Sequence, residues 1–177
     1  MMDRANDLTW HNIKAFLWLL DIEFRTRWFW KLFVFGLVLL LISIKFSISF
    51  NLSDSLPGTA YLIIKKPSQI QKGDLVSYKY YGFLYPKRTP FMKMVKGVHG
   101  DIVTQKGREY FINGQSVGIA KDKSLSGFPL EANHFTGKIP PGKVWVATPS
   151  VNSLDSRYED NGLISEGQIE GKAYLLW

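Results

Sequence analysis

Two residues that can form a catalytic pair stand in separate short blocks of the sequence, Ser55 and Lys93. A serine hydroxyl needs a base before it can act as a nucleophile, and a lysine amine without its proton can be that base. A lysine in water has a pKa of about 10.4 and is charged at neutral pH. Burial would lower the pKa of Lys93, and Phe91 and Val95 would be its apolar neighbours on one face of a strand.

A second hydroxyl stands two residues before the candidate nucleophile, at Ser53. Residues i and i−2 share a face of an extended segment, so Ser53 could donate a hydrogen bond to the oxyanion that forms when Ser55 attacks a peptide bond. The backbone N–H of Ser55 could be the second donor. Pro57 would stiffen the turn that follows.

A third block, Ser153 to Tyr158, brings together two serines, an aspartate and an arginine. Asp155 and Arg157 are two positions apart and could pair on one side of a strand. Ser153, on the same side, could hydrogen-bond the lysine amine and aim it at the nucleophile.

Each block also has a simple structural explanation when it is taken alone. A Ser-x-Ser-x-Pro segment is often a surface turn, and a lysine on a strand is usually a solvated charge. An Asp–Arg pair can serve only to hold the fold together, although such a pair also fixes the geometry of a neighbouring site.

The composition excludes several kinds of chemistry. The chain has 177 residues and no cysteine, so disulfides, thiolate nucleophiles and cysteine-based zinc sites are absent. Its three histidines lie far apart and form no metal-binding pair, and we expect no metal and no cofactor. The net charge of +7 is spread over the chain without a basic run longer than two residues, which argues against binding to nucleic acid.

An apolar segment at residues 29–50 must position these blocks. Its uncharged core, residues 32–44, is shorter than the roughly 20 residues that span a bilayer, but Lys31 and Lys45 can extend their amines to the interfaces. We therefore expect a transmembrane helix over 29–50, and a buried core helix is the alternative. Arg25, Arg27 and Lys31 crowd its N-terminal side, which predicts that this side is cytoplasmic.

The residues before this span predict a second helix, over 8–27. Ile13, Phe16, Leu17, Leu20 and Phe24 recur at helical spacing. We interpret residues 1–28 as a cytoplasmic amphipathic helical segment. It would lie on the membrane surface or dock a partner protein.

After residue 59 the patterns are mainly those of β-strands. We predict one all-β catalytic domain over 51–177, with a long loop over 121–138 and a closing strand over 164–173. The other predicted strands cover 60–64, 75–81, 91–95, 102–104, 110–112 and 143–147.

Taken together, the three blocks resemble the type I signal peptidases, which are Ser/Lys membrane peptidases. They look most like the conjugative-transfer branch, the TraF-type peptidases that mature pilin subunits. The family's Ser-x-Ser followed by Pro is matched by residues 53–57, its Lys-x-Val-x-Gly-x-x-Gly-Asp by 93–101, and its Ser-x-Asp-Ser-Arg-Tyr by 153–158. The conjugative branch adds an Asn before the first block and a Tyr after it, matched by Asn51 and Tyr61.

This resemblance implies a role for each residue of the blocks. Ser55 would be the nucleophile, Lys93 the general base and Ser53 an oxyanion donor. Ser153 would orient the lysine. In the family the Asp and Arg of the third block brace the site, a role that here falls to Asp155 and Arg157.

The resemblance also implies a setting. The enzyme would be a single-pass protein of the bacterial inner membrane, with a cytoplasmic N-terminus and a periplasmic antiparallel β domain. Its substrate would be a pilin-like precursor, cut by hydrolysis or joined head to tail into a ring, and the residues do not decide between these outcomes. The N-terminal helix could contact other conjugation or secretion proteins. The alternative is a catalytically inactive envelope assembly subunit of a conjugative secretion apparatus.

Overall fold

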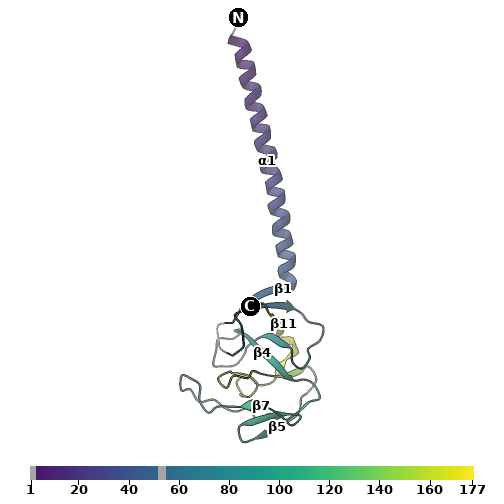
Figure 1. The fold of residues 1–177 in the computed structure, drawn as a ribbon, viewed down its shortest axis with the longest axis vertical. Helices are drawn as coiled ribbons and strands as arrows, with labels where there is room; N and C mark the ends of the chain where they lie inside the picture. The colour runs from purple at the N-terminus through teal and green to yellow at the C-terminus, as the bar shows by residue number, and fades with distance from the viewer. Residues whose placement is uncertain (1–2, 52–54) are drawn as a thin grey trace. The chain divides into compact units, whose positions relative to one another are not determined.

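The computed structural model describes residues 3–51 and 55–177, and the chain divides into two compact units after Ile44 (Figure 1). The first unit is a single helix, α1 (Asp3–Lys45). The stretch Asn12–Lys45 is long and apolar enough to span a membrane, and none of it is buried. A helix of this length is consistent with a single-pass membrane anchor.

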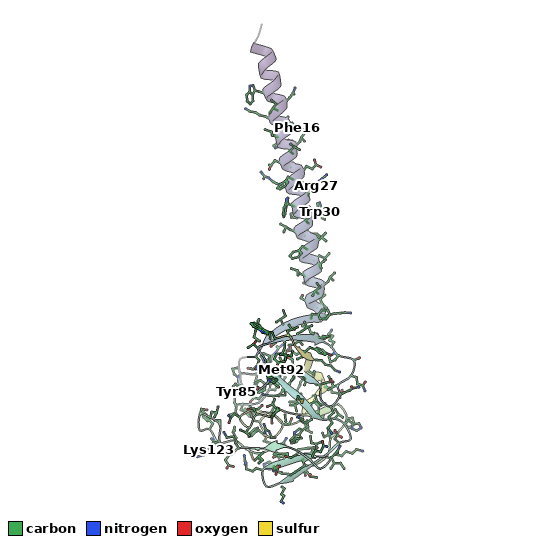
Figure 2. The ribbon with its side chains drawn as sticks, viewed as in Figure 1. Phe16, Arg27, Trp30, Tyr85, Met92 and Lys123 are labelled. Carbon is green, nitrogen blue, oxygen red and sulfur yellow. The ribbon has the colours of Figure 1, made fainter. Side chains whose placement is uncertain are left out.

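The helix is continuous, whereas two helical segments with a junction near residue 28 were expected. No glycine or proline lies between Asp3 and Phe35 to break it. Ion pairs one turn apart, Arg25 with Asp21 and Arg27 with Glu23, run along the expected junction at 2.7 Å each. The side chains labelled Phe16, Arg27 and Trp30 in Figure 2 therefore belong to one element.

The helix ends at Lys45, so the expected helix over residues 46–50 is a strand instead. This strand, β1 (Phe46–Phe50), pairs antiparallel with β2 (Ala60–Lys65) and belongs to the second unit. The sequence Phe-Ser-Ile-Ser-Phe alternates with the period of two that suits a strand. Its three apolar side chains are exposed.

Two antiparallel sheets build the second unit, which confirms the expected fold class. Within the described residues, seven strands form the larger sheet in the order β1-β2-β11-β3-β4-β9-β10, and four form the smaller one in the order β7-β6-β5-β8. Figure 1 shows β4 and β11 on one side of this unit and β5 and β7 on the other. The remaining strands are β3 (Leu75–Lys79), β4 (Pro90–Gly97), β5 (Ile102–Lys106), β6 (Glu109–Ile112), β7 (Gln115–Ile119), β8 (Gly137–Lys138), β9 (Lys143–Ala147), β10 (Ile164–Ser165) and β11 (Ile169–Leu175).

Most of the strands predicted from the sequence are present, with small shifts of their ends. The closing strand differs, because the 3₁₀ turn η1 (Glu166–Gln168) divides it. Its first part, β10, pairs with β9, and its second part, β11, pairs with β2 and β3. The long loop over 121–138 contains two isolated bridges, Lys123 with Pro129 and Ala132 with Tyr158, and ends in β8 at residues 137–138.

The end of the second sequence block connects the two sheets. Gly97 closes β4, and a Cβ there would lie 2.7 Å from Ile139 Cδ1 and 2.9 Å from Ile112 Cδ1, so a larger residue would have to displace these two side chains. Asp101 accepts hydrogen bonds from the Val98 N–H at 3.0 Å and from Asn113 Nδ2 at 2.6 Å. These residues of the block have structural roles, which leaves Lys93 as its chemical group.

Candidate active site

Lys93 lies in the middle of β4 and is buried. The strand alternates, and Lys93, Val95 and Gly97 are its buried positions. The Lys93 side chain is 7% exposed, so it is not the solvated charge that a lysine on a strand usually is. Its Nζ lies over the ring of Phe91, 5.4 Å from the ring centroid, as expected for residues two apart on one strand.

Burial lowers the pKa of Lys93 to about 8. The cause is desolvation, because the low-dielectric surroundings disfavour the charged amine. Asp155 opposes this effect through its negative charge, and Arg157 adds to it through its positive charge. Near neutral pH, part of the protein therefore carries Lys93 as a neutral amine that can accept a proton.

Ser55 lies at the start of a turn that three neighbouring residues hold in place. Leu56 is buried in a cluster with Tyr61. Asn51 Nδ2 donates to the carbonyl oxygens of Leu56 at 2.9 Å and Gly58 at 3.2 Å. The Tyr61 hydroxyl donates to the carbonyl oxygen of Pro57. The turn after Ser55 is therefore fixed by side chains from both ends of the segment.

Gly58 completes this turn for two reasons. Its φ of +80° lies in the left-handed region that favours glycine. A Cβ at this position would also clash with Leu175 and lie 3.0 Å from the carbonyl oxygen of Trp177. The C-terminal strand thus packs closely against the turn after Ser55.

A cavity of about 580 Å³ brings the sequence blocks together, and we call it the catalytic pocket. Ser55, Lys93 and Ser153 all line it, although they come from three parts of the chain. Its other lining residues are Ser49, Phe50, Asn51, Ser77, Tyr85, Thr89, Pro90, Phe91, Met92, Asn152 and Leu154.

Ser153 lines this pocket and carries a buried hydroxyl without a hydrogen-bond partner among the described residues. The residue is 3% exposed. A buried polar atom without a partner costs free energy, so its retention calls for an explanation such as a catalytic role. The neutral amine of Lys93 would be a suitable partner, since both side chains line the same cavity.

Asp155 and Arg157 form a buried ion pair beside these residues. Arg157 Nε donates to Asp155 Oδ1, and Arg157 Nη2 donates to Asp155 Oδ2, both at 2.8 Å. The side chains are 0% and 1% exposed. The segment around them is an irregular turn, so the pair does not lie along a strand as expected.

The same pair ties down the loop that carries Ser153. Arg157 donates to the carbonyl oxygens of Ser150 at 2.8 Å and Ile119 at 3.2 Å. Asp155 accepts from the Thr148 N–H at 3.3 Å. The loop is therefore held to the end of β9 and to β7, and the position of Ser153 follows from that network.

One candidate residue, Ser53, lies outside the described residues. Sequence reasoning also missed some lining residues of the pocket. Ser49 and Phe50 were assigned to the transmembrane helix, although their alternation with Ile48 was a signal for a strand. Tyr85 lies in a loop between β3 and β4, where no pattern marks it. Asn152 directly precedes the third block and could have been included in it.

Comparisons with known proteins agree with this architecture. The family model described as signal peptidase, peptidase S26, matches residues 23–177. Among solved structures, a signal peptidase I from Enterococcus faecalis V583 is 21% identical, with a TM-score of 0.41 over 60% of this chain and 98% of that chain. A comparison with curated proteins gave no match. Because the family model spans every strand and all the residues of the catalytic pocket, the chain belongs to the signal peptidase family of serine peptidases, peptidase S26.

Proposed function

We propose that the protein is a membrane-anchored endopeptidase in which Ser55 is the nucleophile and Lys93 the general base. The observation that carries this proposal is that a lysine with a pKa lowered to about 8 lines the same pocket as the serine. Ser53 is an oxyanion donor in this proposal. Ser153 orients the lysine, while Asp155 and Arg157 hold the loop of Ser153.

In this reaction Lys93 acts twice as a base and twice as an acid. The Ser55 Oγ attacks the carbonyl carbon of the scissile bond, and its proton passes to the neutral Nζ of Lys93. Lys93 then gives this proton to the leaving amine as the C–N bond breaks, which leaves an acyl group on Ser55. A second nucleophile attacks the ester, Lys93 takes its proton, and that proton returns to the Ser55 Oγ.

The second nucleophile decides the product. Attack by water hydrolyses the ester, whereas attack by the substrate's own amine closes a ring. Both reactions release the same enzyme, and the described residues of the pocket are compatible with either. The ring is lighter than the linear product by one water, so intact mass distinguishes them.

We propose a pilin-like precursor as the substrate, in a conjugative or related secretion apparatus. Support comes from Asn51 and Tyr61, the two residues that match the conjugative branch. Both hydrogen-bond to the turn after Ser55. The residues that distinguish the branch in sequence thus contact the segment that positions the nucleophile.

The anchor places this chemistry at a membrane. In our proposal α1 crosses the bacterial inner membrane once, with the basic residues Arg25, Arg27 and Lys31 on the cytoplasmic side. The β domain is then periplasmic. The exposed apolar residues before the basic cluster, among them Trp10 and Phe16, are available to other proteins of the apparatus.

Co-expression with a candidate pilin precursor tests the proposal. The intact mass of the pilin is recorded with wild type, Ser55→Ala and Lys93→Ala. Ser116→Ala and Lys106→Ala serve as matched controls, because both residues are exposed and lie in the smaller sheet, away from the pocket. We expect both site variants to abolish maturation and both controls to retain it.

Unchanged maturation in Ser55→Ala and Lys93→Ala would contradict the dyad. If pilus assembly also survived both substitutions but failed when residues 8–27 were deleted, the protein would be an assembly subunit without peptidase activity. If the dyad were needed to process some other protein but not pilin, the proposed peptidase activity would stand. The proposed pilin substrate would then be wrong.

A further inference from the structure

A second cavity adjoins the catalytic pocket at the loop of Ser153. It has a volume of about 430 Å³, and we call it the side groove. It shares Tyr85, Asn152, Ser153 and Leu154 with the catalytic pocket. In the view of Figure 2, Tyr85 lies between Met92 of β4 and Lys123 beyond it. A polypeptide in the catalytic pocket can therefore continue into the side groove without leaving the protein surface.

One wall of the side groove is the loop between β3 and β4, and this loop is firmly held. Asp160 accepts a hydrogen bond from the Phe83 N–H at 2.6 Å, and the Tyr80 hydroxyl accepts one from the Leu84 N–H at 2.9 Å. The ring of Tyr85 packs against that of Phe91, with centroids 5.4 Å apart. On this fixed loop the Phe83 side chain is 94% exposed.

A second wall is a small hairpin over residues 122–130. The Ser124 N–H donates to the carbonyl oxygen of Phe128 and the Leu130 N–H to that of Asp122, both at 2.8 Å. The hairpin carries Leu125, which is 82% exposed, and Phe128, which is 62% exposed. Apolar side chains thus stand exposed on both walls, an arrangement that marks an interaction site.

The base of this hairpin gives the groove a positive charge. Lys121 and Lys123 line it, and no Asp or Glu does so among the described residues. Lys121 Nζ donates to Asn152 Oδ1 at 2.8 Å, which places it beside Ser153. The acidic residue of the hairpin, Asp122, pairs instead with Arg108 at 3.0 Å and does not line the groove. A bound segment with an acidic residue would complement this charge.

The position of Ser153 indicates which part of a substrate reaches the groove. In the proposed mechanism Lys93 gives its proton to the leaving amine, so that amine must lie within hydrogen-bond reach of Lys93 Nζ. Ser153 is the proposed partner of Lys93 and lines both cavities. The residues that follow the leaving amine therefore pass Ser153 and enter the side groove.

We propose that the side groove binds the segment of the polypeptide substrate that follows the scissile bond, and that it selects apolar and acidic residues there. This inference rests on the proposed dyad of Ser55 and Lys93. Lys123 selects the acidic residue, and Phe128 with Phe83 selects the apolar one. These three residues determine specificity and take no part in the proton transfers.

Exchange of residues after the scissile bond tests this inference. Two probes are used: a model preprotein with a basic N-region, an apolar core and an Ala-x-Ala cleavage site, and the candidate pilin precursor. In each, the two residues after the cleavage point become Leu-Glu, Leu-Lys, Ser-Glu or Ser-Lys. The full-length protein in detergent is assayed for kcat/KM as wild type, Lys123→Glu and Phe128→Ser.

Two substitutions in the smaller sheet are matched controls. Lys106→Glu makes the same charge change on an exposed lysine, and Ile102→Ser removes an apolar side chain that is 53% exposed. Neither residue lines the groove. Wild type and both controls should prefer Glu over Lys by about 3-fold, the size of an exposed charge contact.

The groove variants should change selectivity and retain activity on the remaining substrates. Lys123→Glu should reverse the preference, so that Lys is favoured over Glu. Phe128→Ser should lower kcat/KM about 10-fold for the Leu substrates and leave the Ser substrates unchanged. Because each comparison is made within one variant, partial misfolding cannot produce it.

Three results would overturn the inference. Wild type could cleave all four versions equally, or Lys123→Glu could change all four by one factor. The third result is that the effect of the groove variants depends on residues before the scissile bond. The groove would then bind the segment before that bond and not the segment after it. Failure of wild type to cleave either probe is a different outcome, since it would remove the proposed peptidase activity itself.

Discussion

Two buried polar pairs lie next to each other in this protein, and they differ in how their hydrogen bonds are satisfied. Asp155 and Arg157 are completely buried, and each makes several hydrogen bonds within the fold. Lys93 and Ser153 are 7% and 3% exposed. Ser153 Oγ has no hydrogen-bond partner among the described residues, and Lys93 Nζ lies over the ring of Phe91. The charges of Asp155 and Arg157 are satisfied by hydrogen bonds within the fold, whereas the Ser153 hydroxyl is not.

This difference separates a group that stabilises the fold from one that is available for chemistry. A satisfied buried ion pair fixes the backbone around it, and breaking it leaves an uncompensated charge. A desolvated lysine destabilises the fold while it is charged, but it gains a pKa suited to proton transfer. Residues 153–157 contain members of both pairs, and in our proposal the Asp155–Arg157 pair positions Ser153 and, through it, Lys93.

Removal of the lysine charge should have the largest effect on activity. Lys93→Met keeps the length of the side chain and removes the base, and we expect a loss of about 10⁴-fold in the rate of precursor cleavage. The folded protein should be retained, as judged by its thermal unfolding. Activity within about tenfold of wild type would show that Lys93 is not the base.

The second prediction concerns the satisfied pair. Arg157→Met leaves Asp155 buried without its partner and should lower the free energy of unfolding by about 3–5 kcal/mol. Denaturant unfolding measures this change. Lys79→Ala, which removes the half-exposed ion pair of Lys79 with Glu170, is the control and should cost no more than about 1 kcal/mol. Equal effects of the two substitutions would contradict the role of Arg157.

Substitution of Lys93 should have the opposite effect to substitution of Arg157, because it should increase the free energy of unfolding at neutral pH. Its pKa is lowered from 10.5 to about 8 in the folded state, so between these values the unfolded chain binds more protons. Wild-type stability therefore rises with pH from about 8 to 10.5. At pH 7, Lys93→Met should be more stable than wild type by up to about 3 kcal/mol, and this advantage should shrink across the same window. A variant less stable than wild type at pH 7 would contradict desolvation as the dominant effect.

The smallest expected effect is that of Ser153→Ala, which tests whether Ser153 orients Lys93 or only stabilises the fold. Ser153→Ala removes a hydroxyl that has no partner among the described residues, so the free energy of unfolding should change by less than about 1 kcal/mol. The kcat should fall about 100-fold with little change in KM, because the lysine is less well aimed. Ser153→Thr, which keeps a hydroxyl, should recover part of the loss. A kcat near that of wild type for Ser153→Ala would remove its orienting role.

The large antiparallel domain was accessible from the sequence because its strands alternate and its turns carry glycine. The burial of Lys93 was also accessible, since Phe91 and Val95 flank it at strand spacing. The extent of α1 was not: local patterns suggested two helices, but no residue interrupts the backbone hydrogen bonds between them. The strand over 46–50 was hidden because its apolar residues extend a helical apolar run.

The side groove and the surroundings of the Asp155–Arg157 pair could not be predicted from the sequence, because they depend on contacts between residues far apart in the chain. No pattern in residues 81–88 or 122–130 indicates that these loops line one groove together with Ser153. Hydrogen bonds between distant residues bring them there, such as Lys121 Nζ to Asn152 at 2.8 Å and Phe83 N–H to Asp160 at 2.6 Å. The spacing of Asp155 and Arg157 predicted their pairing, but not the loops that their hydrogen bonds hold.

The pH dependence of kcat/KM tests most directly whether Lys93 acts as a buried base. Cleavage of the precursor by the full-length protein is measured from pH 6 to pH 10. Because the neutral amine is the active form, the rate should rise with pH and level off above an apparent pKa of about 8. A rate that is flat over this range, or one that still rises steeply at pH 10, would contradict the account.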